Sequence, residues 1–296
     1  MRIATTTMYQ QAIDAIGDRQ AQMARSQQEL ASGRRLLRPS DDPGAAAQAE
    51  RLRSQASRLE LAQRMNDFAR GMLGQAESTL AQVGELLQSL RERFVQAGNG
   101  TLGPSDRASL AIQMRAERDE LLRMANAADG AGGHLFGGIG TGSPPFSAAA
   151  AWRALAGEQQ VGLDEGVPTS LDGRALFMSG PSSLFARLDG AIAALEDPAA
   201  TGAQVQAAVG DGLAAVDGGL ERVLAGRTRL GEDLKLLDAR DALSGDASLA
   251  IAERLSGLVD TDYARSASDL ARHQAVLQAA LKTYASIGGL SLFDHL

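Results

Sequence analysis

Three histidines and one serine–aspartate–histidine cluster are the groups in this chain whose types could support catalysis. His134, His273 and His295 are far apart in the sequence, and neither an HExxH motif nor a carboxylate cluster accompanies them, so the pattern predicts no metal site. Ser291 and Asp294 stand beside His295 and would supply the groups of a catalytic triad. These residues occupy one short segment that we expect to be flexible, without a scaffold for an oxyanion hole. The sequence therefore predicts no catalytic residue.

A glycine-rich run from Gly130 to Gly142 is the segment that could hold a phosphate. It contains neither a GxGxxG motif after a clear strand nor a Gly-Lys-Ser/Thr sequence, the patterns in which backbone N–H groups cradle phosphates. We interpret the run as a hinge. The chain contains no cysteine, which excludes disulfides, thiolate metal sites and cysteine nucleophiles. The sequence thus predicts no cofactor, no metal and no enzyme.

Composition and charge favour a helical structural protein. Only 4% of the residues are aromatic, fewer than a compact enzyme core usually holds. The net charge of -7 argues against nucleic acid as a partner, because phosphate binding needs a concentrated basic surface. The chain has no run of about 20 apolar residues, so we expect no membrane insertion. Its first residues lack the apolar core of a secretory signal, and these features alone predict a cytoplasmic protein.

Two apolar rows between Leu52 and Ala97 organise the chain. Each repeats every seven residues, which keeps one seam on one side of a helix and requires another long helix as partner. Asn66 interrupts the seam, and we expect it to set the register between helices. The first row contains Leu52, Leu59, Asn66, Leu73, Leu80, Leu87 and Phe94. The second row contains Ala62, Ala69, Ala76, Val83, Leu90 and Ala97.

A second seven-residue pattern downstream supplies the partner helix, so we expect an elongated antiparallel helical bundle. Its main row contains Val209, Val216, Val223, Leu230 and Leu237. Between the two patterns, glycines and prolines separate short apolar clusters such as Val161–Leu163 and Ala175–Met178. This composition predicts a small β-containing insert with turns at 164–166 and 172–173.

Capping residues predict where the helices begin. After the break around Pro39, Ser40 or Asp41 is expected to cap the first long helix, with Pro43 in its first turn. Ser105 is expected to cap the helix that follows. We expect the last helix to begin near residue 246 or 248.

Both ends of the chain carry thinner apolar seams, whose companion rows are partly polar. Fixing one backbone residue costs about 1–2 kcal/mol, whereas burying one apolar side chain contributes about 1.5–3 kcal/mol. We therefore expect the terminal arms to be disordered in the monomer and to become helical on assembly. The predicted division has terminal coiled-coil arms at 1–39 and 256–296, an α-helical core rod at 40–134 and 181–255, and the β-containing outer insert at 135–180.

Three segments resemble the flagellin superfamily. Residues Leu30–Ala46, with the sequence LASGRRLLRPSDDPGAA, resemble the N-terminal signature of that family. Leu270–Leu296 resembles its terminal helix, and Arg222–Gly231 resembles its returning core helix. The resemblance covers both ends and the bundle and leaves only residues 135–180 unmatched.

Within the superfamily, three details are similar to the proteins of the hook–filament junction and differ from flagellin. The chain starts Met1-Arg2-Ile3-Ala4-Thr5, Pro39 and Pro43 bracket the Asp-Asp pair, and the end is the segment Leu290–Leu296. One departure is His295, where the family more commonly has tyrosine, and we assign no contact to it.

The resemblance implies a structural component of the bacterial flagellum that enables assembly and motility. It implies self-assembly into a ring, with the first hook-associated protein on the hook side, flagellin on the filament side and an export chaperone before secretion. Export through the flagellar type III apparatus needs no cleaved signal, so the implied location is extracellular, and this replaces the cytoplasmic prediction. The alternatives are a flagellin, which would form long filaments, and a soluble helical-bundle adaptor with ordered ends.

The resemblance also assigns the arms to assembly. The expected assembly interface contains Tyr9, Ile16, Met23, Leu30, Leu270, Leu277, Leu281 and Tyr284. At the joint between arm and rod, opposite charges are expected to fix an angle, through Arg34, Arg35, Asp41 and Asp42. On charge and periodicity alone, the rows would more often form an intramolecular bundle and the arginines a solvated helix end.

Overall fold

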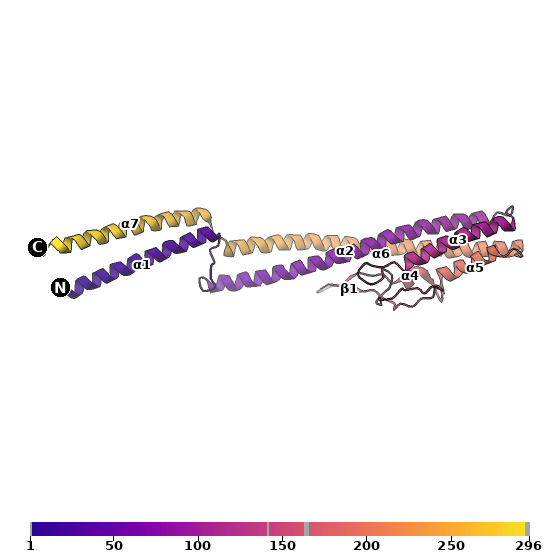
Figure 1. The fold of residues 1–296 in the computed structure, drawn as a ribbon, viewed down its shortest axis with the longest axis horizontal. Helices are drawn as coiled ribbons and strands as arrows, with labels where there is room; N and C mark the ends of the chain where they lie inside the picture. Colours follow the sequence, from indigo (N-terminus) through magenta and orange to yellow (C-terminus); the bar gives the residue numbers. More distant parts are fainter. Residues whose placement is uncertain (1, 141, 163–165, 294–296) are drawn as a thin grey trace. The chain divides into compact units, whose positions relative to one another are not determined.

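The chain folds mainly into α-helices, as its seven-residue rows predict. The computed structural model describes residues 2–140, 142–162 and 166–293, with side chains for residues 7, 10–140, 142–162 and 166–285. The helices are α1 (Arg2–Ser32), α2 (Pro43–Ala97), α3 (Pro104–Ala125), α4 (Gly173–Phe177), α5 (Leu184–Glu196), α6 (Gly202–Val259) and α7 (Tyr263–Phe293). Figure 1 shows them along the chain.

Two compact units divide the chain at positions inside the two long helices. Residues 1–59 and 245–296 form one unit, and residues 60–244 form the other. Both α2 and α6 therefore contribute to each unit. The division into arms, rod and insert that the sequence predicts uses different boundaries and stays a prediction.

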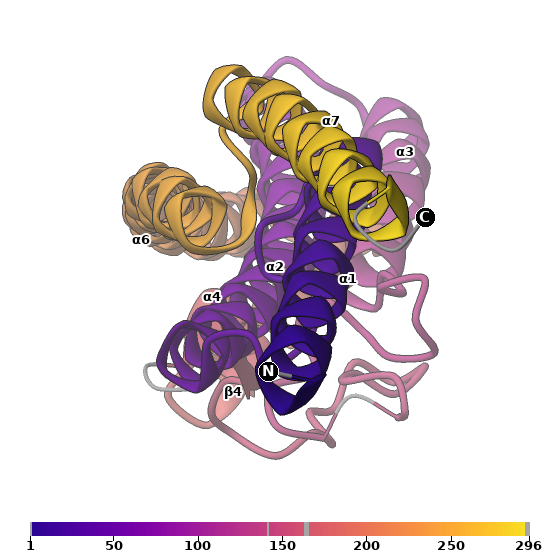
Figure 2. The same cartoon turned by 90° about the vertical axis from the view of Figure 1, so that its left-hand side faces the viewer.

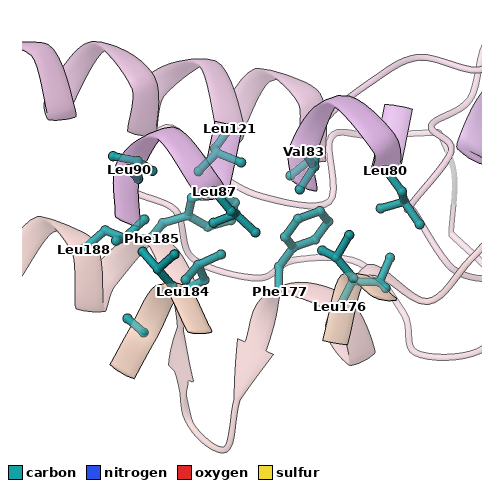
Figure 3. Packing of buried hydrophobic residues seen from close by; sticks show 14 of the residues in the cluster. Leu80, Val83, Leu87, Leu90, Leu121, Leu176, Phe177, Leu184, Phe185 and Leu188 are labelled. Atoms are coloured by element: carbon teal, nitrogen blue, oxygen red, sulfur yellow. The ribbon is translucent and has the colours of Figure 1, made fainter. Parts of the chain in front are cut away.

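The core of the 60–244 unit is the seam that the apolar rows predict. Along α2, both rows are buried from Ala69 to Ala97, and along α6 the row from Val209 to Leu237 is buried against them. Figure 3 shows leucines of α2 facing side chains of α4 and α5. Each fully buried leucine or phenylalanine contributes about 1.5–3 kcal/mol, so this unit has a substantial core of its own.

Three glycines of α6 allow neighbouring side chains to approach the helix. Gly212, Gly219 and Gly226 recur every seven residues and therefore lie on one side of α6,. A Cβ at Gly212 would overlap the ring of Phe94, and a Cβ at Gly226 would overlap Leu176 of α4. The glycine row is thus the side of α6 on which the other elements of this unit pack.

Helix α3 packs along α2, and α5 packs against α3. Ser89 Oγ of α2 donates to Glu117 Oε1 of α3 at 2.9 Å, and Arg93 Nε donates to the same oxygen at 2.7 Å. Arg118 of α3 pairs with Asp189 of α5 and lies 5.8 Å from the ring centroid of Phe185. These polar contacts fix the two shorter helices on the bundle.

The insert contains two short antiparallel ladders and one short helix. Strand β1 (Gln160–Val161) pairs with β2 (Val167–Pro168), and β3 (Met178–Ser179) pairs with β4 (Ser182–Ser183). The predicted β content is therefore present, but the apolar cluster at 175–178 lies mostly in α4. Asp172 Oδ1 accepts from Arg174 N at 2.9 Å and caps α4, so the turn predicted at 172–173 is wrong. The turn predicted at 164–166 falls largely outside the described residues.

Three predicted helix starts are wrong. Helix α2 is capped by Asp42, whose Oδ1 accepts from Ala45 N at 2.9 Å, and not by Ser40 or Asp41. Helix α3 begins at Pro104 and its N-cap residue is Gly103, so Ser105 lies inside the helix and does not cap it. Helix α6 continues to Val259, so the last helix begins at Tyr263 and not near residue 246 or 248.

Candidate assembly interface

Helices α1 and α7 lie side by side in the 1–59 and 245–296 unit (Figures 1 and 2). They run antiparallel, since the end of α1 is hydrogen-bonded to the connection between α6 and α7, at which α7 starts. The sides that face each other carry the half-buried residues Ile16, Met23 and Leu30 of α1, and Leu270, Leu277 and Tyr284 of α7. Six of the eight expected interface residues are thus half-buried in this helix pair, and their role in assembly stays a prediction.

The two remaining expected interface residues, Leu281 and Tyr9, are not among the half-buried side chains. Leu281 is 45% exposed and does not face α1, and the side chain of Tyr9 lies outside the described residues. Ile13 of α1, next to the expected row, is 49% exposed. Apolar side chains thus remain on the outer sides of both arm helices.

No apolar side chain is buried in either arm helix, among the side chains that the structure describes. Among the described side chains of these two helices, the only buried ones are those of two serines, Ser26 of α1 and Ser266 of α7. An antiparallel helix pair normally gains its stability from buried apolar positions. The apolar side chains of the α1–α7 pair are at most half-buried where they are described, so this contribution is smaller than in the core of the 60–244 unit.

A short backbone clasp joins the end of α1 to the connection between α6 and α7. Arg35 N donates to Val259 O at 2.8 Å, and Thr261 N donates to Gly33 O at 3.0 Å. Gly33 has a φ of 69°, a left-handed conformation that favours glycine,. These bonds fix the turn at which the chain leaves α1 against the turn at which it enters α7.

The four charged residues expected at the joint make contacts other than pairs with each other. Arg35 donates from its guanidinium to Leu258 O at 2.8 Å, and Arg34 forms a backbone bridge with Asp260. Asp41 pairs with Arg25 at 3.3 Å and accepts from Arg38 N at 2.8 Å. Asp42 caps α2. The charges therefore shape turns and helix ends at this joint.

A polar layer in the 60–244 unit interrupts the seam between α2 and α6. Asn66 is 8% exposed, and its Nδ2 donates to Asp241 Oδ1 at 3.2 Å. Arg70 pairs with Asp241 and, at 3.0 Å, with Asp238. The hydrogen bond to Asp241 is the main cause of a raised pKa of Arg70. A buried polar residue in a seam penalises shifted registers, which fits the register role expected for Asn66.

The sequence alone did not identify Gly33, Val259 and the two buried serines as residues of the joint. One feature of the sequence does mark the end of α6, and with it the position of the joint. The α6 row continues every seven residues from Leu237 through 244 and 251 to Leu258, whereas the α7 row restarts at Tyr263. This change of phase, together with the turn-forming residues at 260–262, marks the end of α6.

Within the described residues the structure contains neither a metal site nor a helix that could span a membrane, and part of the Ser-Asp-His segment is not described. In the described parts of the chain, no three potential ligands among His, Cys, Asp and Glu gather where a metal ion could bind. Asp294 and His295 lie outside the described residues. None of the described helices combines the length and the apolar character that a membrane span needs.

Known proteins resemble the chain over different lengths. The family model for the bacterial flagellin N-terminal helical region matches residues 3–141. Flagellar hook-associated protein 3 of Escherichia coli (strain K12) is 35% identical over 317 residues, which cover 99% of this chain and 99% of that protein. Flagellin of Bacillus subtilis (strain 168) is 28% identical over 130 residues, which cover 44% of this chain and 41% of that protein.

A solved structure shows the same fold. The crystal structure of flagellar hook-associated protein 3 from Legionella pneumophila superposes with a TM-score of 0.64 and 17% sequence identity, covering 71% of this chain and 98% of that chain.

Proposed function

This chain belongs to the flagellar hook-associated protein 3 family, and on that premise we propose that it is a structural subunit of the bacterial flagellum at the junction of hook and filament. The full-length similarity to hook-associated protein 3 supports this assignment over flagellin, because the flagellin of Bacillus subtilis aligns with less than half of the chain. The proposed role is mechanical, with assembly and motility as its outcome and no catalysis.

The observation that carries the proposal is the poorly buried pair of arm helices. The half-buried seam of α1 and α7 leaves Ile13 and Leu281 exposed on the outer sides. Burial of such exposed apolar side chains by neighbouring copies would be favourable. We therefore assign the arms to contacts between subunits, and the clasp at Gly33 and Val259 to holding the two arms together.

The proposal includes a set of partners and a location. Copies of the chain form a ring, with the first hook-associated protein on the hook side and flagellin on the filament side. An export chaperone holds the chain before secretion, and the flagellar apparatus exports it to the cell exterior without a cleaved signal. In this arrangement the insert at 135–180 faces outward.

Deletion of the chain in its own host tests the proposal. We expect hooks without attached filaments, flagellin in the medium and no swimming. Antibody labelling of the restored strain is expected at one band between hook and filament. Label along the whole filament would instead identify a flagellin, and normal filaments after deletion would exclude a junction role.

Paired variants test the arm seam in the same strain. Met23→Glu and Leu277→Glu place charges on the seam and are expected to abolish filament attachment. Ile112→Glu, at a position of α3 that is 67% exposed, is the matched control and is expected to swim normally. Equal behaviour of seam and control variants would remove the arms from the proposed interface.

A further inference from the structure

The connection between α1 and α2 and the first turns of α2 form a cavity of about 550 Å³. It lies entirely within the 1–59 and 245–296 unit. The apolar part of its lining contains Leu36, Leu37, Pro39, Pro43, Ala46 and Ala47. The charged part contains Arg34, Arg38, Arg53 and Glu50. We call this cavity the basic pocket.

The basic pocket carries more positive than negative charge. Its one carboxylate, that of Glu50, pairs with Arg53 at 3.3 Å. Arg34 and Arg38 contact their own turn through backbone groups, and within the described residues neither of their guanidinium groups has a hydrogen-bond or ion-pair partner. Both side chains are exposed. Two unpaired positive charges therefore lie at this pocket, in a chain whose net charge is -7.

The acids nearest in the fold do not neutralise these two arginines. The carboxylate of Asp41 bonds to Arg25, and the carboxylate of Asp42 bonds to the start of α2. Asp260 meets Arg34 through the backbone. A carboxylate on another molecule can form two parallel hydrogen bonds with a guanidinium group, so an acidic ligand complements the pocket.

The walls of the basic pocket are fixed in the free chain. Proline rings hold the backbone dihedral φ at Pro39 and Pro43. The cap at Asp42 fixes the start of α2, and the bond from Arg35 N to Val259 O fixes the connection before it. A ligand that enters a preformed site does not have to order it, and this reduces the cost of binding.

The volume and the lining together define the kind of ligand. A cube of this volume has an edge of about 8 Å, less than the diameter of about 10–12 Å of a helix with its side chains, so the occupant is not a whole helix. A simple anion would contact the arginines and leave the leucines and prolines uncovered. A segment that carries both carboxylates and an aliphatic side chain matches both parts of the lining.

We propose that the basic pocket binds an acidic peptide segment of another protein, in which carboxylates stand beside a leucine or a similar aliphatic side chain. A second copy of this chain is a poorer source. Outside its helices and the joint itself, the described acids are already bonded, at Asp129, Glu158, Asp172, Asp197 and Asp262.

Peptide binding to the purified full chain tests the proposal. The probe is a short fluorescein-labelled peptide of alternating aspartate and leucine, and fluorescence anisotropy measures its binding. We expect saturable binding that weakens as salt is added. The same peptide with asparagine in place of aspartate keeps the size and loses the charge, and it is expected to bind at least about tenfold more weakly.

Variants locate the binding site on the chain. The double variant Arg34→Gln/Arg38→Gln is expected to bind the aspartate peptide at least about tenfold more weakly than the natural chain. Arg58→Gln is the matched control, because Arg58 is an exposed arginine of α2 outside the pocket, and it is expected to bind like the natural chain. Because the two peptides are compared on the natural chain, that comparison does not depend on the folding of any variant.

Four results would overturn the proposal. The first is no saturable binding of the aspartate peptide, and the second is equal binding of the aspartate and asparagine peptides or equal loss in the double variant and the control. The third is displacement of the peptide by an equal concentration of inorganic phosphate, which would identify a simple anion site. The fourth is self-association of the natural chain in sedimentation that the double variant abolishes, which would identify a second copy as the occupant. All these measurements use the free chain, so they decide the pocket independently of the junction role.

Discussion

At the scale of single residues, replacing a glycine of α6 by alanine can raise or lower the free energy of unfolding, and the direction depends on the side of the helix on which the glycine lies. Glycine inside a helix costs roughly 1 kcal/mol relative to alanine, because it loses more conformational freedom on folding. Where the glycine admits a neighbouring side chain, a methyl group would meet atoms that are already close-packed. Gly212 lies against Phe94, whereas nothing lies within 4 Å of a Cβ placed at Gly210.

Alanine at these two positions is therefore expected to have opposite effects. Gly212→Ala forces the buried ring of Phe94 to move, and overpacking of this kind costs about 1–3 kcal/mol, which exceeds the gain in helix propensity. Gly210→Ala has open space and is expected to raise the free energy of unfolding by up to about 1 kcal/mol. Urea titrations of the two variants and the natural chain measure both changes. Stabilisation by Gly212→Ala would contradict the close packing between α2 and α6.

At the scale of elements, the joint between α1 and α2 depends on capping more than on attraction between charges. Asp42 follows Arg34, Arg35 and Arg38 in the connection between α1 and α2, and its carboxylate accepts the N–H of Ala45 at the start of α2. Neutral replacements of Asp42 distinguish a role of its charge from a role in capping α2. Asparagine retains the cap and loses the charge, and alanine loses both.

We expect Asp42→Asn to behave like the natural chain and Asp42→Ala to lose about 1 kcal/mol of local stability. Hydrogen exchange of the amides at 43–50 measures this loss, since helix ends open locally. The expected result for alanine is roughly fivefold faster exchange in the first turns of α2, with little change in α3. If Asp42→Asn and Asp42→Ala accelerated hydrogen exchange equally, the charge of Asp42 and not its capping hydrogen bond would stabilise the start of α2.

Helices and seams were predictable from the sequence, and the joints between them were not. The row through Leu80 is buried from Leu73 to Phe94 and the row through Leu230 is buried from Val209 to Leu237, because a seven-residue repeat keeps these positions on one side of a helix,. The break before Tyr263 was missed, since helical residues continue through Gly245 and no proline marks the end of α6. The clasp at Gly33 joins residues more than 200 positions apart. Patterns within one helix do not predict such a contact.

At the scale of the whole molecule, burial is distributed unevenly along the chain. Buried leucines and phenylalanines gather in the 60–244 unit, whereas the described side chains of α1 and α7 include no buried apolar group. Local opening is least costly where few apolar contacts must be broken. The two arms are therefore expected to open in the free chain far more often than the bundle, and to become protected when neighbouring copies cover them.

Limited trypsin digestion of the purified full chain measures this difference, because arginines occur in both regions. Cleavage after Arg19 of α1 and Arg272 of α7 is expected to be more than about tenfold faster than cleavage after Arg115 and Arg118 of α3. The surviving fragment should contain the 60–244 unit, and the same arm sites should resist cleavage in assembled flagella. Arms that resist trypsin in the free chain as well as α3 does would show that α1 and α7 are stable as a pair. Their exposed apolar side chains would then no longer imply neighbours, and the ends of the chain would fold without assembly.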